Sequence, residues 1–311
     1  MIVVENLTKT YGSKKAVDNL SFSVAPGRVT GFLGPNGSGK STTMRCMLGL
    51  DKPDTGITTF DGRKYVDIES PLTFVGSLLD AGDAHKGRTA RNHLRWIAMT
   101  NGISASRVDA VLQMVGMEDA ARTRVGKFSL GMRQRLGLAV ALLGDPKVVI
   151  LDEPANGLDP EGIRWTREVM RHLADEGRSV LVSSHQLVEL SLVADDLVVI
   201  GQGKLISSGP IAQFMTQHAK TWVRVVSPQF DALAELVIAQ GGTVERTSEG
   251  GDFHAVSAVT VGDIAAANKI VLHELSPQTG SLEQAFLDAT DASVEYRGQS
   301  TTTNVWDAPQ P

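Results

Sequence analysis

The hydrophobic positions of the first two thirds of the chain fall into two alternating patterns. Short runs that are apolar at nearly every position occur at residues 29–33, 148–151, 180–182 and 197–200. Such runs are typical of strands that are buried on both faces of a sheet. Stretches with helical periodicity, such as residues 161–176, lie between them. This alternation predicts an α/β domain over residues 1–215, in which helices cover a mainly parallel sheet.

The pattern changes inside this domain and again after it. Residues 86–143 contain no comparable strand run, and they are predicted to form a largely helical subdomain. Residues 216–290 combine a strand-like run with a helical stretch, which predicts a small C-terminal α+β accessory domain. Residues 291–311 are polar and lack periodicity, so we expect a disordered tail there.

Composition narrows the class of protein. The chain has 311 residues, which is more than one typical core, so a large domain with a smaller one is expected. The net charge of −5 gives no electrostatic case for binding nucleic acid. The single cysteine, Cys46, excludes a disulfide scaffold and fits a reducing cytoplasm.

The chain is not expected to cross a membrane. Its longest apolar stretch, around residues 136–143, is far shorter than the ~20 residues that span a bilayer. Its first residues lack the basic flank and apolar core of a signal peptide. Any role in transport would therefore need a separate membrane subunit.

One glycine-rich segment carries a strong phosphate-binding motif. It matches G-x-x-x-x-G-K-[ST] and consists of Gly34, Pro35, Asn36, Gly37, Ser38, Gly39, Lys40 and Ser41. A strand-like run precedes it and a helix-like run that begins at Thr42 follows it, which is the context that the motif requires. Backbone N–H groups and the helix N-terminus would bind phosphate, Lys40 would reach the β- and γ-phosphates, and Ser41 would ligate Mg²⁺. The alternative, a chance glycine-rich turn, is disfavoured by this context.

Two acidic residues end the run at residues 148–151. In a phosphate-transferring site, Asp152 would hold Mg²⁺ and Glu153 would act as the general base for the attacking water. Ligands of open α/β folds bind at the carboxyl ends of the strands, where this pair lies. The alternative is a solvated pair at a strand end, and the phosphate loop on the same chain makes that interpretation weaker.

Together with these motifs, three further segments resemble the ABC ATPase family of P-loop NTPases. Residues 154–160 resemble its D-loop, residues 128–136 resemble its signature loop and the helix after it, and residues 183–185 resemble its switch-histidine segment. Tyr11 also lies near the start of the chain, where the family has an adenine-stacking aromatic. The resemblance covers about residues 1–215, and the motifs occur in the family's order.

One branch of the family is particularly similar. The segment Ser-Leu-Gly-Met-Arg-Gln-Arg-Leu, with Asn-Gly-Leu-Asp downstream, resembles the same segments in ATP-binding subunits of exporters that are often linked to antibiotic or multidrug efflux. The small region that ends with residues 281–287 also resembles that branch's C-terminal appendage.

The resemblance implies an ATPase that uses ATP and Mg²⁺ and works as a head-to-tail pair, here expected to be a homodimer. Ser129 and Gly131 would contact the γ-phosphate that is bound to the second ATPase subunit, and His185 would keep the water aligned with Glu153. Tyr11 would stack on adenine. The alternative for His185 is a buried structural histidine, and the alternative for Tyr11 is an ordinary half-buried tyrosine. The resemblance also implies an integral membrane permease as partner and a peripheral position at the cytoplasmic face of the membrane.

The chain departs from the family pattern in two places. The signature loop has Leu130 where glycine is commonest and Met132 where glutamine is commonest. The family's Q-loop glutamine, a Mg²⁺ contact, aligns with Asp80. A carboxylate can bind Mg²⁺ but cannot donate a hydrogen bond when it is ionised, so Asp80 is a further candidate metal ligand.

Other functions are compatible with such an ATPase. A soluble ABC protein in translation or DNA maintenance is the main alternative, although these usually carry two ATPase domains or a coiled-coil insertion. An inactive nucleotide-binding subunit is disfavoured because Lys40, Asp152, Glu153 and His185 are all present. Import is possible in the same fold, but importers more often show the standard signature and a glutamine in the Q-loop.

Overall fold

The computed structural model describes residues 1–82, 84–184 and 187–290, and these residues form two compact units. The first unit contains Met1–Ile211 and, among the described residues, Thr290. The second unit contains Ala212–Ala289. The division therefore falls at the start of helix α7 (Ile211–His218), slightly before the boundary expected at residue 215. The tail predicted at residues 291–311 lies outside the described residues.

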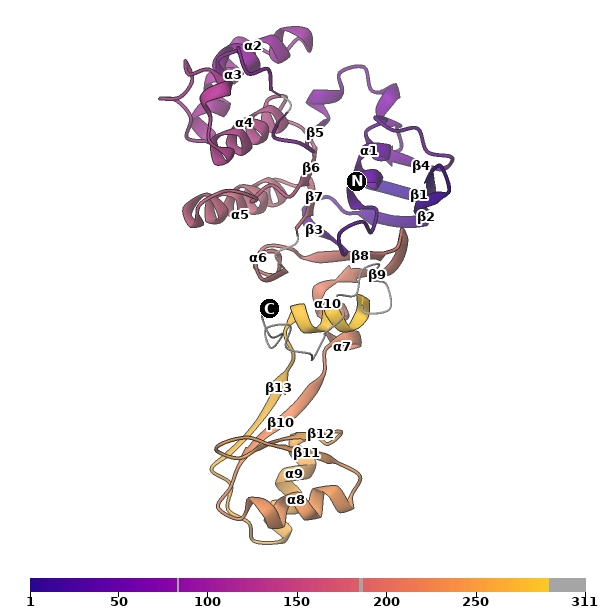
Figure 1. Ribbon diagram of the computed structural model, residues 1–311, viewed down its shortest axis with the longest axis vertical. Helices are drawn as coiled ribbons and strands as arrows, with labels where there is room; N and C mark the ends of the chain where they lie inside the picture. Colours follow the sequence, from indigo (N-terminus) through magenta and orange to yellow (C-terminus); the bar gives the residue numbers. More distant parts are fainter. Residues whose placement is uncertain (83, 185–186, 291–311) are drawn as a thin grey trace, which may run out of the picture. The chain divides into compact units, whose positions relative to one another are not determined.

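Within the described residues, a six-stranded sheet forms the centre of the first unit (Figure 1). Its strands, in spatial order, are β5 (Val75–Leu78), β6 (Val148–Asp152), β7 (Ser179–Ser183), β3 (Arg28–Leu33), β8 (Asp196–Gly201) and β9 (Lys204–Pro210). All neighbours pair in parallel except β9, which is antiparallel to β8. The four apolar runs of the sequence are β3, β6, β7 and β8, so the predicted parallel sheet is confirmed.

The register of this sheet brings several carboxyl ends to one edge. Ser183 at the end of β7 pairs with Asp152 on one side and with Phe32 on the other. Helix α1 (Lys40–Met47) follows β3 at this edge, and helix α5 (Pro160–Asp175) packs against β3 and β7. Asp159 caps α5 by accepting a hydrogen bond from the N–H of Gly162. A short helix, α6 (Leu187–Ser191), precedes β8.

A second, antiparallel sheet of three strands packs beside α1 in the same unit. Its strands in order are β2 (Lys14–Val24), β1 (Ile2–Tyr11) and β4 (Thr55–Phe60). One hydrophobic core joins this sheet, α1 and the central sheet, and it includes Phe32, Met44 and Phe60. Two short 3₁₀ helices, Tyr65–Asp67 and Pro71–Thr73, connect β4 to β5.

The predicted helical subdomain consists of α2 (Ala90–Thr100), α3 (Ala105–Met114), a 3₁₀ turn (Val125–Lys127) and α4 (Leu130–Leu142). Side chains of Thr89, Ser104 and Ser129 cap the three α-helices. Helix α4 packs closely on β5, because Gly137 and Gly76 let the two backbones approach. The helical subdomain is therefore fixed to the edge of the sheet through α4.

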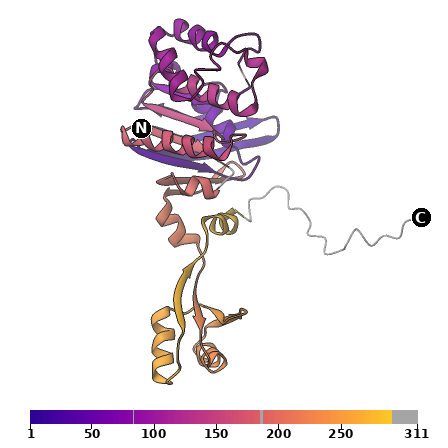
Figure 2. The ribbon, with the colours of Figure 1, turned by 90° about the vertical axis from the view of Figure 1, so that its left-hand side faces the viewer.

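The second unit is a small α+β fold. Its elements run β10 (Thr221–Val226), α8 (Phe230–Ala239), β11 (Thr243–Arg246), β12 (Gly251–His254), α9 (Ala258–Ala267) and β13 (Glu274–Thr279). The antiparallel sheet has the order β11-β12-β10-β13, and β10 and β13 run side by side in Figure 2. This connectivity is the split β-α-β, ferredoxin-like arrangement. Helix α10 (Leu282–Thr290) follows it.

Alternation along β10 separates the two faces of this small sheet. Val223 and Val225 belong to a core with Phe253 and the inner sides of α8 and α9. The intervening residue Arg224 pairs with Asp252 on the opposite face through bonds of 2.8 and 2.9 Å. In neither unit do the described residues include a helix of the length and apolarity that a membrane span requires.

The contact between α4 and β5 predicts a strong effect of one added methyl group. A Cβ at position 76 would overlap the carbonyl oxygen of Ala141. We expect Gly76→Ala to lower the free energy of unfolding by about 1–3 kcal/mol, as overpacking does. The measurement is the midpoint of urea denaturation.

Gly262→Ala is the matched control, because it adds the same methyl group inside helix α9. The nearest atom there is Leu275 Cδ2 at an ordinary 3.4 Å. This change should leave stability unaltered or raise it by up to about 1 kcal/mol, because alanine favours helices. An unchanged midpoint for Gly76→Ala would contradict the close packing of α4 on β5.

Candidate functional site

The phosphate-binding motif forms a tight loop between β3 and α1. Gly39 has φ +104°, and a Cβ there would also overlap the carbonyl oxygen of Ala16, so only glycine fits. Ser38 N–H donates to the Pro35 carbonyl at 3.1 Å. The Lys40 ammonium donates to the carbonyl oxygens of Gly34 at 2.6 Å and Pro35 at 3.3 Å. The loop is thus wrapped around its own lysine.

Lys40 is a buried cation with an unusual electrostatic environment. Only 9% of the residue is exposed, and burial lowers the pKa of its ammonium below the ordinary value. Glu153 and Asp152 act on this pKa in the opposite direction. A buried positive charge gains most from an anionic ligand, so this position favours phosphate binding.

Asp152 connects the loop helix to the sheet. Ser41 Oγ donates to its Oδ2 at 2.7 Å, and Ser183 Oγ donates to its Oδ1. The Glu153 N–H donates to the same Ser183 Oγ at 3.0 Å. Ser183 therefore fixes the positions of both acidic residues at the edge of the sheet.

The backbone at Glu153 turns sharply away from the strand. Its φ of +50° is uncommon for a residue other than glycine and is more frequent at functional sites. The side chain of Gln134, which is buried on α4, donates to the Glu153 carbonyl at 2.9 Å. This bond ties the helix of the signature segment to the acidic pair.

A cleft of about 410 Å³ gathers these groups. Its walls comprise Lys14, Ala16, Asn36, Gly37, Ser38, Gly39, Lys40, Ser41, Thr42, Asp152 and Glu153. The size is that of an ordinary small-molecule site, since such sites occupy roughly 300–1,000 Å³. The structure thus brings most of the predicted phosphate loop together with both predicted carboxylates, while Gly34 and Pro35 hold Lys40 from behind.

The oxygen atoms in this cleft suit Mg²⁺. Ser41 and Asp152 supply a hydroxyl and a carboxylate, which are the hard ligands that Mg²⁺ prefers. Among the described residues no group of three or more His, Cys, Asp or Glu side chains could hold a metal ion. A site with few protein ligands fits Mg²⁺ that also binds substrate phosphates and water.

Asp80 lines a different cleft from this pair. Its Oδ1 accepts a hydrogen bond from the Gly82 N–H at 2.6 Å. It lines a different cleft of about 260 Å³, between the end of β5 and the helical subdomain, together with Leu50, His93 and Arg133. Asp80 does not line the phosphate-loop cleft, although Leu78 at the end of β5 pairs with Leu151 and Asp80 therefore follows at the same edge of the sheet as Asp152. The role of Asp80 as a metal ligand stays a prediction.

The signature segment is also separate from the phosphate loop of the same chain. Ser129 caps α4, where its Oγ accepts a hydrogen bond from the Met132 N–H at 3.2 Å. A Cβ at Gly131 would lie 3.2 Å from the Gly157 carbonyl, so this segment touches the predicted D-loop. Ser129 and Gly131 do not line the phosphate-loop cleft.

Tyr11 stands at the end of β1, and its hydroxyl donates to Asp51 Oδ2 at 2.6 Å. This hydrogen bond is the main reason why the pKa of Tyr11 is raised to about 12. Arg45 also pairs with Asp51, at 2.7 Å, and the Lys9 ammonium lies 5.0 Å from the centre of the Tyr11 ring. The ring is about half exposed, so a face of it is accessible.

His185, the predicted switch residue, lies outside the described residues. Gln134 and Ser183 belong to segments that resemble the signature and switch motifs, but neither was singled out as a site residue. Lys14 and Ala16, which line the cleft, were not singled out from the sequence. Both lie at the start of β2 and belong to no recognised motif.

Comparisons with known proteins agree with this geometry. The ABC transporter family model matches residues 17–156. The chain is 35% identical over 307 residues to an uncharacterized ABC transporter ATP-binding protein, YhcH, of Bacillus subtilis (strain 168), covering 95% of this chain and 97% of that one. It is 41% identical over 223 residues to the bacitracin transport ATP-binding protein BcrA of Bacillus licheniformis, covering 71% of this chain and 73% of the relative.

A solved structure of an ATP-binding subunit of an ABC transporter superposes with a TM-score of 0.65 at 27% identity, covering 70% of this chain and 92% of that one. A family model described only as a domain of unknown function matches residues 221–283, in the second unit. The phosphate loop, the acidic pair and the near full-length relative lead to one conclusion: the chain belongs to the ABC transporter ATP-binding proteins, which bind and hydrolyse ATP.

Proposed function

We propose that this chain powers the export of an antibiotic, drug or other small molecule through a separate membrane permease. The observation that carries the proposal is the cleft in which Lys40, Ser41, Asp152 and Glu153 meet. The bacitracin-transport relative supports this class of cargo. The chain would then lie at the cytoplasmic face of the membrane, bound to the permease.

The residues of the cleft have distinct roles in the proposed reaction. The loop N–H groups and Lys40 bind the β- and γ-phosphates. Water attacks the γ-phosphorus while Glu153 accepts its proton, and the bond to the oxygen that bridges to the β-phosphate breaks, so that ADP leaves and phosphate forms. Ser41 and Asp152 hold Mg²⁺, which when bound neutralises charge on the phosphates. Ser183 holds Asp152 and Glu153 in fixed positions, because its hydroxyl forms hydrogen bonds with both residues.

A second copy of the chain completes the site. Ser129 and the N-terminus of α4 form an anion-binding group, yet they do not line the cleft of their own chain. In a head-to-tail homodimer they contact the γ-phosphate held by the other copy. Loss of that phosphate removes the link between the two copies and lets them separate.

The permease would dock at the cleft that contains Asp80. Its lining is largely apolar and includes Leu78, Leu136 and Val140, and Leu50 at its rim is exposed. On the neighbouring helix α2, Trp96 is 51% and Met99 is 78% exposed. Exposed apolar side chains next to a groove are typical of a protein-binding surface. In this proposal Asp80 contacts the permease.

Replacing the general base separates ATP binding from turnover. We expect Glu153→Gln to reduce kcat by about 10²–10⁴-fold, because the amide cannot accept the proton. ATP binding should persist, and the variant should elute as a dimer from a sizing column with ATP. Lys40→Ala is the contrasting variant and should weaken nucleotide binding itself. Near wild-type hydrolysis by Glu153→Gln would show that Glu153 is not the base.

The role of Tyr11 can be tested by separating its ring from its hydroxyl. We expect Tyr11→Ala to lose about 1–3 kcal/mol of ATP binding, as in other base-stacking sites. Tyr11→Phe keeps the ring and loses only the bond to Asp51, so it should bind ATP like the wild type. Fluorescent ATP titration measures both. Equal affinity of the alanine variant and the wild type would exclude stacking.

The transport role predicts a stable membrane partner. Affinity purification of the chain from detergent-solubilised membranes of its host should recover a polytopic membrane protein in roughly equal amount, identified by mass spectrometry. The same purification with Met99→Glu should recover less, because a charge would enter the exposed apolar surface. Recovery of ribosomal or DNA-maintenance proteins instead would favour the alternative function and reject transport.

A further inference from the structure

A short connection joins the two functional segments of the first unit. Helix α4 begins after Ser129 in the signature segment and ends at Leu142, and β6 begins at Val148 and ends at Asp152. Residues 143–147 therefore act together with the packing of α4 on β5 in setting the direction of α4. Asp145, in the middle of this connection, has φ +56°, a conformation that aspartate and asparagine tolerate better than most residues.

Arg107 holds the helical side of this connection. It lies on α3, and its guanidinium donates to the carbonyls of Leu142 at 3.1 Å and Leu143 at 3.2 Å. A cation at this position satisfies carbonyls that a helix C-terminus leaves unpaired. Its Nη2 also donates to Asp145 Oδ1 at 2.9 Å. The end of α4 is thereby fixed to α3 and to Asp145.

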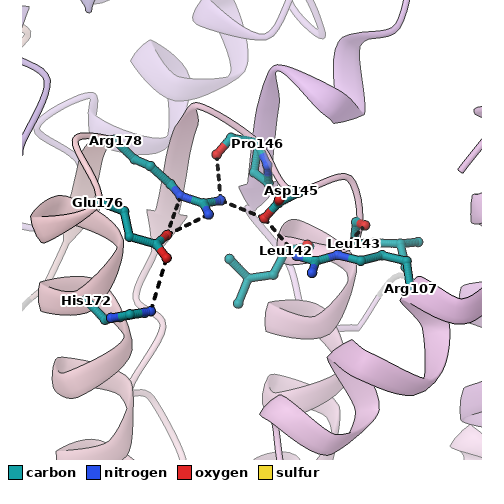
Figure 3. Close-up of polar contacts among 8 residues, drawn as sticks. All are labelled: Arg107, Leu142, Leu143, Asp145, Pro146, His172, Glu176 and Arg178. Atoms are coloured by element: carbon teal, nitrogen blue, oxygen red, sulfur yellow. Dashed lines mark hydrogen bonds and ion pairs between the residues drawn. The ribbon is translucent and has the colours of Figure 1, made fainter. Parts of the chain in front are cut away.

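Arg178 holds the sheet side. It directly precedes β7, and its Nη1 donates to Asp145 Oδ1 at 3.0 Å and to the Pro146 carbonyl at 3.0 Å. Glu176 orients the same guanidinium through bonds of 2.9 and 2.6 Å. Figure 3 shows Asp145 between the two arginines, which approach it from opposite sides.

One carboxylate oxygen thus accepts hydrogen bonds from both subdomains. Without this carboxylate, Arg178 would keep Glu176 as a partner, but Arg107 would lose its carboxylate partner and the link between the two arginines would be broken. Helix α4 has 13 residues and spans about 20 Å at ~1.5 Å per residue, so a small rotation at one end displaces the other end by a large distance. A tilt of about 10° at Asp145 would move Ser129 by about 3 Å, which is the length of a hydrogen bond.

We propose that Asp145, clamped between Arg107 and Arg178, is a positioning residue that sets the angle of α4 and so presents Ser129 to the nucleotide on the second copy. The clamp touches no part of the phosphate-loop cleft, so it acts through α4 alone. This proposal rests on the head-to-tail dimer of the proposed function.

The first test measures the angle directly. Spin labels at Glu5→Cys on β1 and Gln113→Cys on α3 report the distance between the three-stranded antiparallel sheet and the helical subdomain by double electron–electron resonance. Cys46 is the chain's own cysteine, and it resists labelling because burial raises the pKa of its thiol to about 11. Asp145→Gly should shift or broaden the distance distribution without nucleotide, and Asp145→Asn should do so less.

The second test measures turnover of the unlabelled variants. Asp145→Gly should reduce kcat by about tenfold or more, because small misplacements of catalytic groups are costly. The Kd of the chain for ATP should change less than about twofold, since neither Asp145 nor its two arginines line the phosphate-loop cleft. Asp145→Asn should fall between, because its Oδ1 still accepts both hydrogen bonds. Arg107→Gln should resemble Asp145→Gly, and it decides the question if the glycine variant does not fold.

Glu168→Gln is the matched control, because it removes an exposed ion pair with Arg164 within the single helix α5. It should leave the distances and kcat unchanged. A wild-type distance distribution in Asp145→Gly and Arg107→Gln would overturn the proposal, as would a parallel loss of ATP binding and kcat. A wild-type chain without ATPase activity would instead reject the proposed function, while the distances would still test the clamp.

Discussion

The hydrogen bond between Ser41 and Asp152 is the contact on which the site depends. It joins the first turn of α1 to the end of β6, two segments that are far apart in the sequence. Ser183 extends this contact to β7 and to the backbone of Glu153. The groups for phosphate binding and for proton transfer are therefore positioned by one small hydrogen-bond network at the edge of a rigid, buried sheet.

The sequence was sufficient for the local parts of this arrangement. Apolar runs predicted β3, β6, β7 and β8, because strands that are buried on both faces contain few polar residues. The phosphate loop was predictable because its glycines and lysine are contiguous. These features depend on neighbouring residues only, and the structure reproduces them with small shifts of their ends.

Contacts between distant segments could not be predicted in this way. The sequence aligned Asp80 with a metal contact, and the structure adds that it lines a second cleft beside the helical subdomain, which the sequence did not indicate. Lys14 belongs to no sequence motif, and only the fold gives it a place in the cleft. Ser183 belongs to the segment that resembles the switch motif, but its contacts with the acidic pair come from the pairing of β6 with β7. The bond from Gln134 to Glu153 likewise depends on tertiary packing.

The ends of the ferredoxin-like fold in the second unit lie next to each other. Thr221 at the start of β10 pairs with Thr279 at the end of β13, and the Gly280 N–H donates to the Lys220 carbonyl at 2.8 Å. The chain thus enters and leaves this fold at one point. In terms of chain path the segment is an insertion: a direct splice from Lys220 to Gly280 would join two points that already share a hydrogen bond, so α7 and α10 could be connected without it.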